Sequence, residues 1–531
     1  MTGRNPLISE SETASAADGL TDDCGDADQS PETIGAQAQA EEVAVAVANK
    51  PVGPSRLVGA TLNYGLGSIL PQVINFLLIP VYTRFLSGTD IGTLDLAGSF
   101  GLILVVVMRL GMPGAVTRFY FDHREGAGLQ DYVTTVNRFL WFSSITIGGL
   151  IFGLAFYFGD QLLPGVAIGY IGLVVVMSIL SCNTDLQRRM LQAREQSRYT
   201  AILTISTALA NVVLAIVFVA VFRMGMNGMF LAQFLAIGAF FLQARVYLAP
   251  DLKGRFQSHF IRPTLQYGAG IVLSHFLGNF GPYYVRSLLA GRESLEVVGL
   301  FGIASRFTNP LMIAFTAFNT AFIPIYFAAR KHESAEAEEN LTSAVRNTWT
   351  LALFLFLGTI CLAPPAILIM TPQPYHAAAP LVRVLAVGLM GQAIYLLFTP
   401  EIFYRKKTWM ITVVTFFGVT VTVGMSNLLV DRYGLYGVAW STAMGQVASG
   451  LLGGILSFSL ERRSSLKWSC IARTTLIAAA VGSLLLLPEP INPFLALLRG
   501  AGLVATFVAL SWVFGDPSLR QLSRLAVARF S

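Results

Sequence analysis

The residues of this sequence that give the clearest indication of its chemistry are charged side chains inside long apolar stretches. They are Arg84, Asp95, Arg109, Arg286, Arg306 and Arg383. A charge at the centre of a membrane span costs on the order of 2.5–3.5 kcal/mol on insertion scales, so such residues face a cavity or a partner. Arginines outnumber the acid here, and the guanidinium fork suits phosphate oxygens. The set therefore predicts a positively charged cavity, within a membrane, that binds an anion.

Helical spacing arranges these charges in polar stripes. The stripes are Asp95, Ser99, Val106 and Arg109; Gly302, Arg306, Asn309, Thr316 and Thr320; Gln72, Asn75, Ile79 and Tyr82; and His275, Asn279, Pro282 and Arg286. From them we expect the substrate-binding residues to be Arg84, Arg109, Arg286 and Arg306. The expected polar residues of the cavity, which are also candidates for ion coupling, are Asp95, Gln72, Asn75, Asn279 and Asn309.

Each of these residues also has a plainer interpretation. Arg84, Arg286 and Arg383 fall near the ends of apolar stretches, where a guanidinium can snorkel to the lipid headgroups. Asp95 is either a counter-ion for an arginine or a binding site for a coupling H⁺ or Na⁺. The amides and His275 suit hydrogen bonds between helices as well as a cavity wall. The sequence by itself leaves these alternatives open.

The elements that must position these residues are membrane-spanning helices. Hydrophobic residues make up 54% of the chain and charged residues 12%, against roughly 45–50% and about 25% in an ordinary soluble domain. Apolar stretches of about 20 residues, enough to cross the hydrocarbon core, recur about 14 times. The expected spans are 57–85, 91–119, 133–157, 166–185, 199–222, 228–247, 264–290, 297–327, 348–370, 377–404, 410–430, 437–460, 471–487 and 494–514. The predicted fold is an all-α polytopic protein of the cell inner membrane.

Basic residues predict the orientation of these spans. Lys and Arg gather in the loops after every second span, whereas the opposite loops carry only Arg223, Arg292 and Arg432. Cytoplasmic loops carry the excess of Lys and Arg in membrane proteins. Both termini are therefore expected in the cytoplasm.

The chain repeats itself at three places in the same order. Residues 64–67 match 267–270, 91–94 match 298–301, and 225–228 match 434–437. This pattern predicts two six-helix lobes in the same orientation, followed by two extra helices. The expected division is a disordered acidic cytoplasmic tail (1–55), an N-terminal lobe (56–250), a C-terminal lobe (251–462), two extra helices (463–515) and a cytoplasmic C-terminal tail (516–531).

Other signals of enzymatic or metal chemistry are missing from the sequence. The four cysteines are far apart and form no CxxC pair, so they predict neither a metal site nor a disulfide framework. No P-loop, HExxH motif or nucleophile elbow occurs. We expect a protein that is not an enzyme, binds no nucleic acid and needs no cofactor beyond a coupling H⁺ or Na⁺.

Several motifs resemble a known family. They are residues 63–65 (NYG), 79–86 (IPVYTRFL), 91–94 (IGTL), 110–120 (LGMPGAVTRFY) and 434–442 (GLYGVAWST). They resemble the polysaccharide transporter, or O-antigen flippase, family of the multidrug/oligosaccharidyl-lipid/polysaccharide exporter superfamily. Judged by span order, the resemblance covers roughly residues 57–515.

The resemblance implies a fold and an activity. It implies a two-lobed, V-shaped bundle that works by alternating access. Its cationic central cavity would accept the pyrophosphate and sugars of an undecaprenyl-linked oligosaccharide, while the lipid tail stays in the bilayer. The implied partners are that lipid-linked oligosaccharide, the phospholipid bilayer, and a polysaccharide polymerase with its export machinery.

Two other functions are weighed against a flippase. A cation-coupled multidrug antiporter of the same superfamily would need an acid in an apolar pocket, and the first expected span has no Asp or Glu. A membrane glycan polymerase or ligase would carry a large outer loop with catalytic residues, and the outer loops expected here are short. The sequence favours the flippase.

Overall fold

Every element in the described part of the chain is helical. The computed structural model describes residues 70–514 except 71, 75, 123–127, 195, 333–334, 406, 408, 461–467, 487–489 and 491. Ten helices among these residues are long and apolar enough to cross a membrane. The prediction of an all-α polytopic membrane protein is confirmed. Both expected tails and Asn75 lie outside the described residues.

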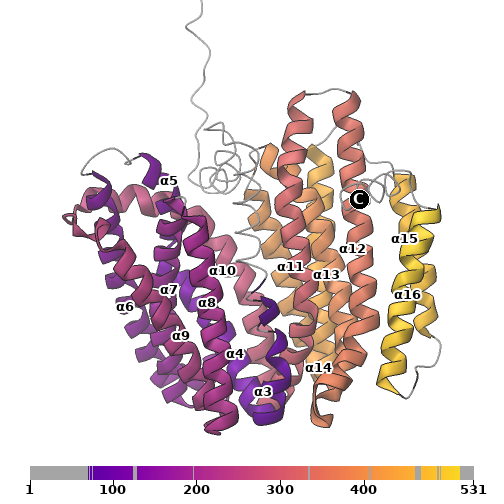
Figure 1. The fold of residues 1–531 in the computed structure, drawn as a ribbon, viewed down its shortest axis with the longest axis horizontal. Helices are drawn as coiled ribbons and strands as arrows, with labels where there is room; N and C mark the ends of the chain where they lie inside the picture. The colour runs from indigo at the N-terminus through magenta and orange to yellow at the C-terminus, as the bar shows by residue number, and fades with distance from the viewer. Residues whose placement is uncertain are drawn as a thin grey trace, which may run out of the picture. The chain divides into compact units, whose positions relative to one another are not determined.

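The N-terminal half of the described chain is built around α4. Its helices are α3 (Ile79–Phe85), α4 (Gly88–Arg109), α5 (Met112–Asp122), α6 (Gly128–Leu162), α7 (Ile168–Ala193), α8 (Ser197–Ala215, continued by a π-helical turn at Ile216–Val221) and α9 (Gly225–Leu248). Helix α4 packs on α6 and α7, and α9 packs on α7 and α8; these helices are the indigo and magenta ribbons of Figure 1. A reciprocal capping box between Ser87 and Asp90 begins α4, which stabilises the start of the helix that carries Asp95.

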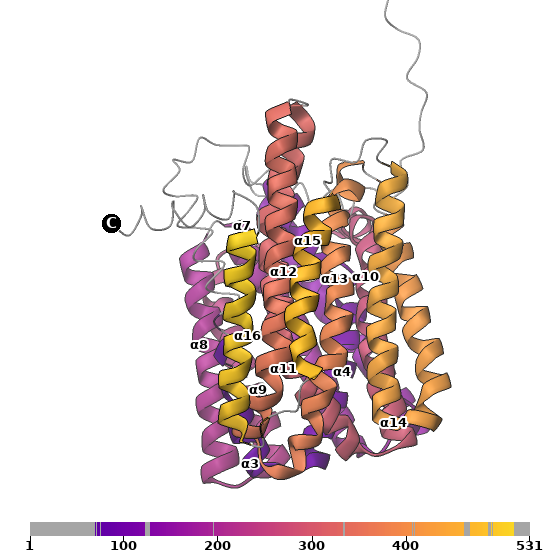
Figure 2. The same cartoon turned by 90° about the vertical axis from the view of Figure 1, so that its right-hand side faces the viewer.

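The C-terminal half contains the remaining long helices. They are α10 (Ile261–Arg292), α11 (Leu295–His332), α12 (Ala335–Met370), α13 (Ala379–Tyr404), α14 (Trp409–Leu460), α15 (Trp468–Ser483) and α16 (Pro493–Phe514). Helix α13 packs on α11, α12 and α14, and α10 packs on α14. The last two helices pack on each other and on α12 (Figure 2).

Helix α14 is a hairpin rather than one straight helix. It is 52 residues long, and Gly434 breaks it with φ 51° and ψ −131°. A residue with a Cβ rarely adopts a positive φ, so glycine suits this position. The two arms touch at Gly445, where a Cβ would lie 1.9 Å from Thr422 Oγ1. The expected spans 410–430 and 437–460 fall on either side of the break.

Helices α4 and α11 join the two halves of the molecule by direct backbone contact near their N-terminal ends. A Cβ on Gly92 would lie 1.7 Å from the carbonyl oxygen of Leu295, and one on Gly299 would lie 2.5 Å from that of Gly88. Only glycine allows two helices to approach so closely. We call Gly88, Gly92 and Gly299 the glycine seam. It places Asp95, one helical turn after Gly92, at the contact between the halves.

Candidate functional site

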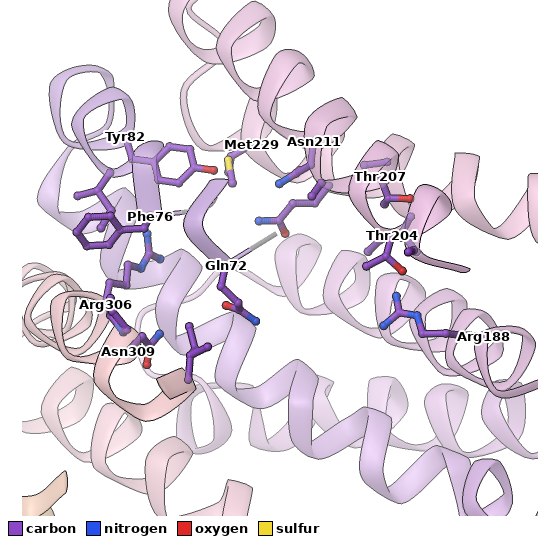
Figure 3. Close-up of a pocket in the computed structure, with 18 of the residues that line it drawn as sticks. Gln72, Phe76, Tyr82, Arg188, Thr204, Thr207, Asn211, Met229, Arg306 and Asn309 are labelled. Atoms are coloured by element: carbon purple, nitrogen blue, oxygen red, sulfur yellow. The ribbon is translucent and has the colours of Figure 1, made fainter. Parts of the chain in front are cut away.

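A cavity of about 740 Å³ lies between the two halves. Its walls come from α7, α8 and α9 on one side and α11 on the other, with α3 and the residues just before it between them (Figure 3). Arg188 of α7 and Arg306 of α11 supply its charges, and no Asp or Glu occurs among its described lining residues. The wall is therefore positively charged, and it suits an anion.

Arg306 extends from α11 into this cavity. Its side chain keeps 30% of its surface exposed, and its Nη2 lies 3.7 Å from Asp95 Oδ1. The guanidinium lies 5.9 Å from the centre of the Tyr82 ring, a distance at which the ring attracts a cation. Figure 3 shows Arg306 beside Tyr82, Phe76 and Asn309. Arg306 is thus held on one side by an acid and an aromatic ring and is open on the other.

Asp95 lies behind Arg306 and connects three helices. Its Oδ2 accepts a hydrogen bond of 2.5 Å from Arg286 Nε on α10, and only 12% of its side chain is exposed. Arg286 also donates from Nη1 to the carbonyl oxygen of Pro282, at 3.0 Å. A Cβ on Gly302 would lie 2.7 Å from the carboxylate of Asp95. The absence of a side chain on Gly302 therefore lets the α4 acid reach the α10 and α11 arginines.

Arg109 is paired within the N-terminal half. Its Nη1 lies 2.9 Å from Asp185 Oδ2 of α7, and it is not among the cavity lining residues. Asp185 was not predicted as a partner because the apolar stretch of the sequence ends there. The helix itself continues to Ala193, so Asp185 stands inside α7 and neutralises Arg109.

Arg84 is an exposed residue at the end of α3. It forms no ion pair with a described residue and does not line the cavity. Of the four arginines expected to bind substrate, the structure brings Arg286 and Arg306 together through Asp95, and only Arg306 lines this cavity.

Only some of the expected polar residues line the cavity. Gln72 and Asn309 line the cavity. The side chain of Asn279 donates a 2.8 Å hydrogen bond to the carbonyl oxygen of His275 in its own helix, and neither residue is in the lining. Asn75 lies outside the described residues.

Arg188 is a cavity residue that the sequence analysis missed. The sequence places it in a basic loop, whereas the structure places it in α7, with its Nε buried and without a hydrogen-bond partner in the described part of the chain. Its guanidinium lies 5.2 Å from the centre of the Phe240 ring of α9. The apolar residues Leu186, Met190 and Leu191, at helical spacing around Arg188, were the available signal that the helix continues.

A second buried acid, Glu401 of α13, lies in the C-terminal half away from the cavity. It is 2% exposed, and it accepts a hydrogen bond from the Tyr326 hydroxyl. Arg330 Nε lies 3.6 Å and Arg405 Nε 2.9 Å from its carboxylate oxygens. The hydrogen bond to Glu401 raises the pKa of Arg405. These contacts connect the C-terminal ends of α11 and α13.

No group of three or more His, Cys, Asp or Glu side chains that could hold a metal ion occurs among the described residues. Asp95, an acid next to the cavity, is already engaged by two arginines. A coupling cation at Asp95 would therefore have to compete with Arg286 and Arg306.

A family model and several solved structures match this chain. The model of the family described as "Polysaccharide biosynthesis protein" matches residues 59–330. No curated protein matches the chain by sequence. The lipid II flippase MurJ in an inward closed conformation has a TM-score of 0.68 at 14% identity, over 86% of this chain and 99% of that chain.

Multidrug transporters share the fold as well. An inward-facing multidrug resistance MATE family transporter of the MOP superfamily has a TM-score of 0.62 at 15% identity, over 75% of this chain and 97% of that one. A MATE family transporter in an outward-facing conformation has a TM-score of 0.52 at 16% identity, over 75% of this chain and 95% of that chain. The family match confirms the predicted resemblance to a family of polysaccharide biosynthesis. At these identities the structural likeness concerns the fold alone.

Proposed function

This chain belongs to the polysaccharide biosynthesis protein family, and from that premise we propose that it is a flippase for a lipid-linked oligosaccharide. In this proposal the chain is a multi-pass membrane transporter and not an enzyme, which its family and its fold support. In our proposal the substrate is an undecaprenyl-pyrophosphate-linked oligosaccharide, which crosses the inner membrane by alternating access.

The observation that carries the proposal is the charge of the cavity. Arg188 and Arg306 line it, and none of its described lining residues is acidic. An anionic headgroup gains from such a wall, whereas a cationic drug would be repelled by it. Of the four arginines expected to bind substrate, Arg306 is the one we assign to the pyrophosphate. Arg286 acts through Asp95, and Arg84 and Arg109 have supporting roles outside this cavity.

The topology in our proposal follows the charge of the loops. The chain would have fourteen spans, as two six-helix lobes (56–250 and 251–462) and two extra helices (463–515). Both tails, 1–55 and 516–531, would lie in the cytoplasm. The glycine seam then lies toward the outer side, and the substrate enters from the cytoplasm. A polysaccharide polymerase would receive the glycan on the outer side.

Asp95 supplies a link between substrate binding and opening of the seam. It contacts Arg306 at 3.7 Å and Arg286 at 2.5 Å. A pyrophosphate that binds Arg306 competes with Asp95 for the same guanidinium, because both are anions that the fork binds. Loss of that contact weakens the junction of α4 with α11 beside the seam. A coupling H⁺ would act at the same place, by neutralising Asp95.

The test is export by a strain in which the gene is deleted and then restored as a variant. With wild type restored, surface polysaccharide returns. With Arg306→Gln, we expect lipid-linked oligosaccharide to accumulate on the cytoplasmic side and surface polysaccharide to be lost, at normal membrane levels of the protein. Arg189→Gln is the control, because Arg189 adjoins a cavity residue but is absent from the lining. Export at the wild-type level by Arg306→Gln would overturn the assignment of the pyrophosphate site.

A further inference from the structure

The cavity has two arginines at well-separated positions, not one charged centre. Gly165, just before α7, lies against the side chain of Leu295, the first residue of α11, so the two helices begin at the same end. At about 1.5 Å per residue, Arg306 lies about 16 Å along α11 and Arg188 about 30 Å along α7. Figure 3 shows them on opposite sides of the cavity.

Arg188 has unused capacity to bind an anion. Its Nε is buried and has no hydrogen-bond partner among the described residues. The nearby acid on the same helix, Asp185, is engaged by Arg109 at 2.9 Å. The Phe240 ring, 5.2 Å away, holds the guanidinium from one side without satisfying its donors. A buried donor without a partner is unfavourable, and a bound anion would remove that penalty.

The wall next to Arg188 suits sugar hydroxyls. Thr200, Thr204 and Thr207 of α8 line the cavity, and each hydroxyl donates its proton to a carbonyl oxygen of its own helix. Their oxygens remain able to accept hydrogen bonds. Asn211 adds a buried amide oxygen that has no hydrogen-bond partner among the residues described. Figure 3 shows Thr204 and Thr207 on the same side of the cavity as Arg188, and their acceptors match the hydroxyl donors of a carbohydrate.

We propose that Arg188 and the neighbouring α8 residues form a second anion subsite that binds a carboxylate on the sugar part of the substrate. This inference rests on the proposed flippase function, with the pyrophosphate at Arg306. The translocated glycan is then acidic: it carries a sugar such as a uronic acid at a distance from the lipid. The backbone positions of the two arginines differ by about 14 Å in depth and their side chains lie on opposite sides of the cavity, so in our proposal each arginine binds a different anionic group.

The experiment measures binding of two synthetic probes to the full-length protein in lipid nanodiscs. Both probes are short polyprenyl-pyrophosphate-linked disaccharides, and they differ only in whether the outer sugar is glucuronic acid or glucose. Wild type is expected to bind the glucuronic acid probe about 10-fold more tightly, the size of one charge-assisted hydrogen-bonded contact. Arg188→Gln should remove that preference by weakening only the acidic probe.

Three variants separate this subsite from the pyrophosphate site. Arg188→Lys keeps the charge without the fork and should retain part of the preference. Arg189→Gln is the matched control and should retain all of it. Arg306→Gln should weaken both probes by a similar factor and leave the preference unchanged.

Each contrary result has its own meaning. Equal binding of the two probes by wild type, with both weakened by Arg306→Gln, overturns the acidic-glycan inference and leaves the flippase proposal standing. Equal weakening of both probes by Arg188→Gln overturns the inference too, because Arg188 then holds the pyrophosphate. Failure of wild type to bind either probe overturns both proposals.

Discussion

Two carboxylates that are largely shielded from solvent, Asp95 and Glu401, have nearly the same chemistry but different places in the fold. Each is flanked by two arginines, at 2.5 and 3.7 Å for Asp95 and at 2.9 and 3.6 Å for Glu401. Asp95 connects α4 of the N-terminal half with α10 and α11 of the C-terminal half. Glu401 connects α11 and α13, which both belong to the C-terminal half.

The difference indicates which ion pairs can take part in transport. An alternating-access cycle moves the two halves relative to each other, so contacts between halves must break, whereas contacts within one half persist. Asp95 also shares Arg306 with the cavity, whereas Glu401 contacts no cavity residue in the described part of the chain. We therefore expect Asp95 to act on conformation and Glu401 on stability.

The largest effect on folding is expected at Glu401. Glu401→Gln removes the acid beside Arg330 and Arg405, and loss of one partner from a buried ion cluster lowers the free energy of unfolding by about 3 kcal/mol. The measurement is the unfolding midpoint of the purified protein, together with its yield in the membrane. Normal stability with lost export would contradict the comparison, because Glu401 would then serve transport.

The next effect is expected at the glycine seam. Gly299→Ala places a methyl group against the carbonyl oxygen of Gly88, and overpacking of this kind costs about 1–3 kcal/mol. Because the glycine seam is closed in this conformation, the substitution should favour a conformation in which the seam is open, and export should fall. The measurement is labelling of an introduced Asn309→Cys by an impermeant maleimide from the outer side.

A matched control exists on the partner helix of the seam. Gly98→Ala in α4 meets no atom within 4 Å and should leave labelling unchanged. Equal labelling of Gly98→Ala and Gly299→Ala would show that the seam does not separate the cavity from the outer side.

Asp95→Asn should act in the same direction as Gly299→Ala but less strongly. The amide keeps the shape of the side chain and loses the charge that attracts Arg286 and Arg306. We expect about 10-fold more outer-side labelling at Asn309→Cys, equivalent to a shift of about 1.4 kcal/mol between the two conformations. The unfolding midpoint should fall by less than in Glu401→Gln. A larger fall than in Glu401→Gln would reverse the comparison.

The smallest effect is expected at Arg84. It is exposed and has no ion pair among the described residues, so Arg84→Gln should change the free energy of unfolding by less than about 0.5 kcal/mol. Export should fall less than in Arg306→Gln. Equal loss of export in the two variants would place Arg84 on the path of the headgroup after all.

Part of the site could be predicted from the sequence, because a polar residue within an apolar helix by itself indicates a cavity or a partner. Arg306, Gln72 and Asn309 are polar within apolar helices, and each lines the cavity. Asp185 and Arg188 could not be placed in the same way. An apolar stretch of about 20 residues indicates how much of a helix fits in the hydrocarbon core. It does not indicate how far the helix continues beyond that core. Glu401 was missed for a different reason: it lies inside the expected span 377–404 but at its end, next to the basic residues Arg405 and Lys407, where a charged side chain gives no sign of burial.

The sequence by itself determined that this is an all-α membrane protein with intramembrane arginines, because hydrophobicity and charge act locally along the chain. The pairing of those arginines was decided only by the tertiary structure. Arg109 pairs with Asp185, and Arg286 pairs with Asp95, and both pairs join residues that are far apart in the sequence. A charge in a membrane is either neutralised by a partner or available to a ligand. The difference depends on which helices pack together, and packing left Arg306 and Arg188 facing the cavity.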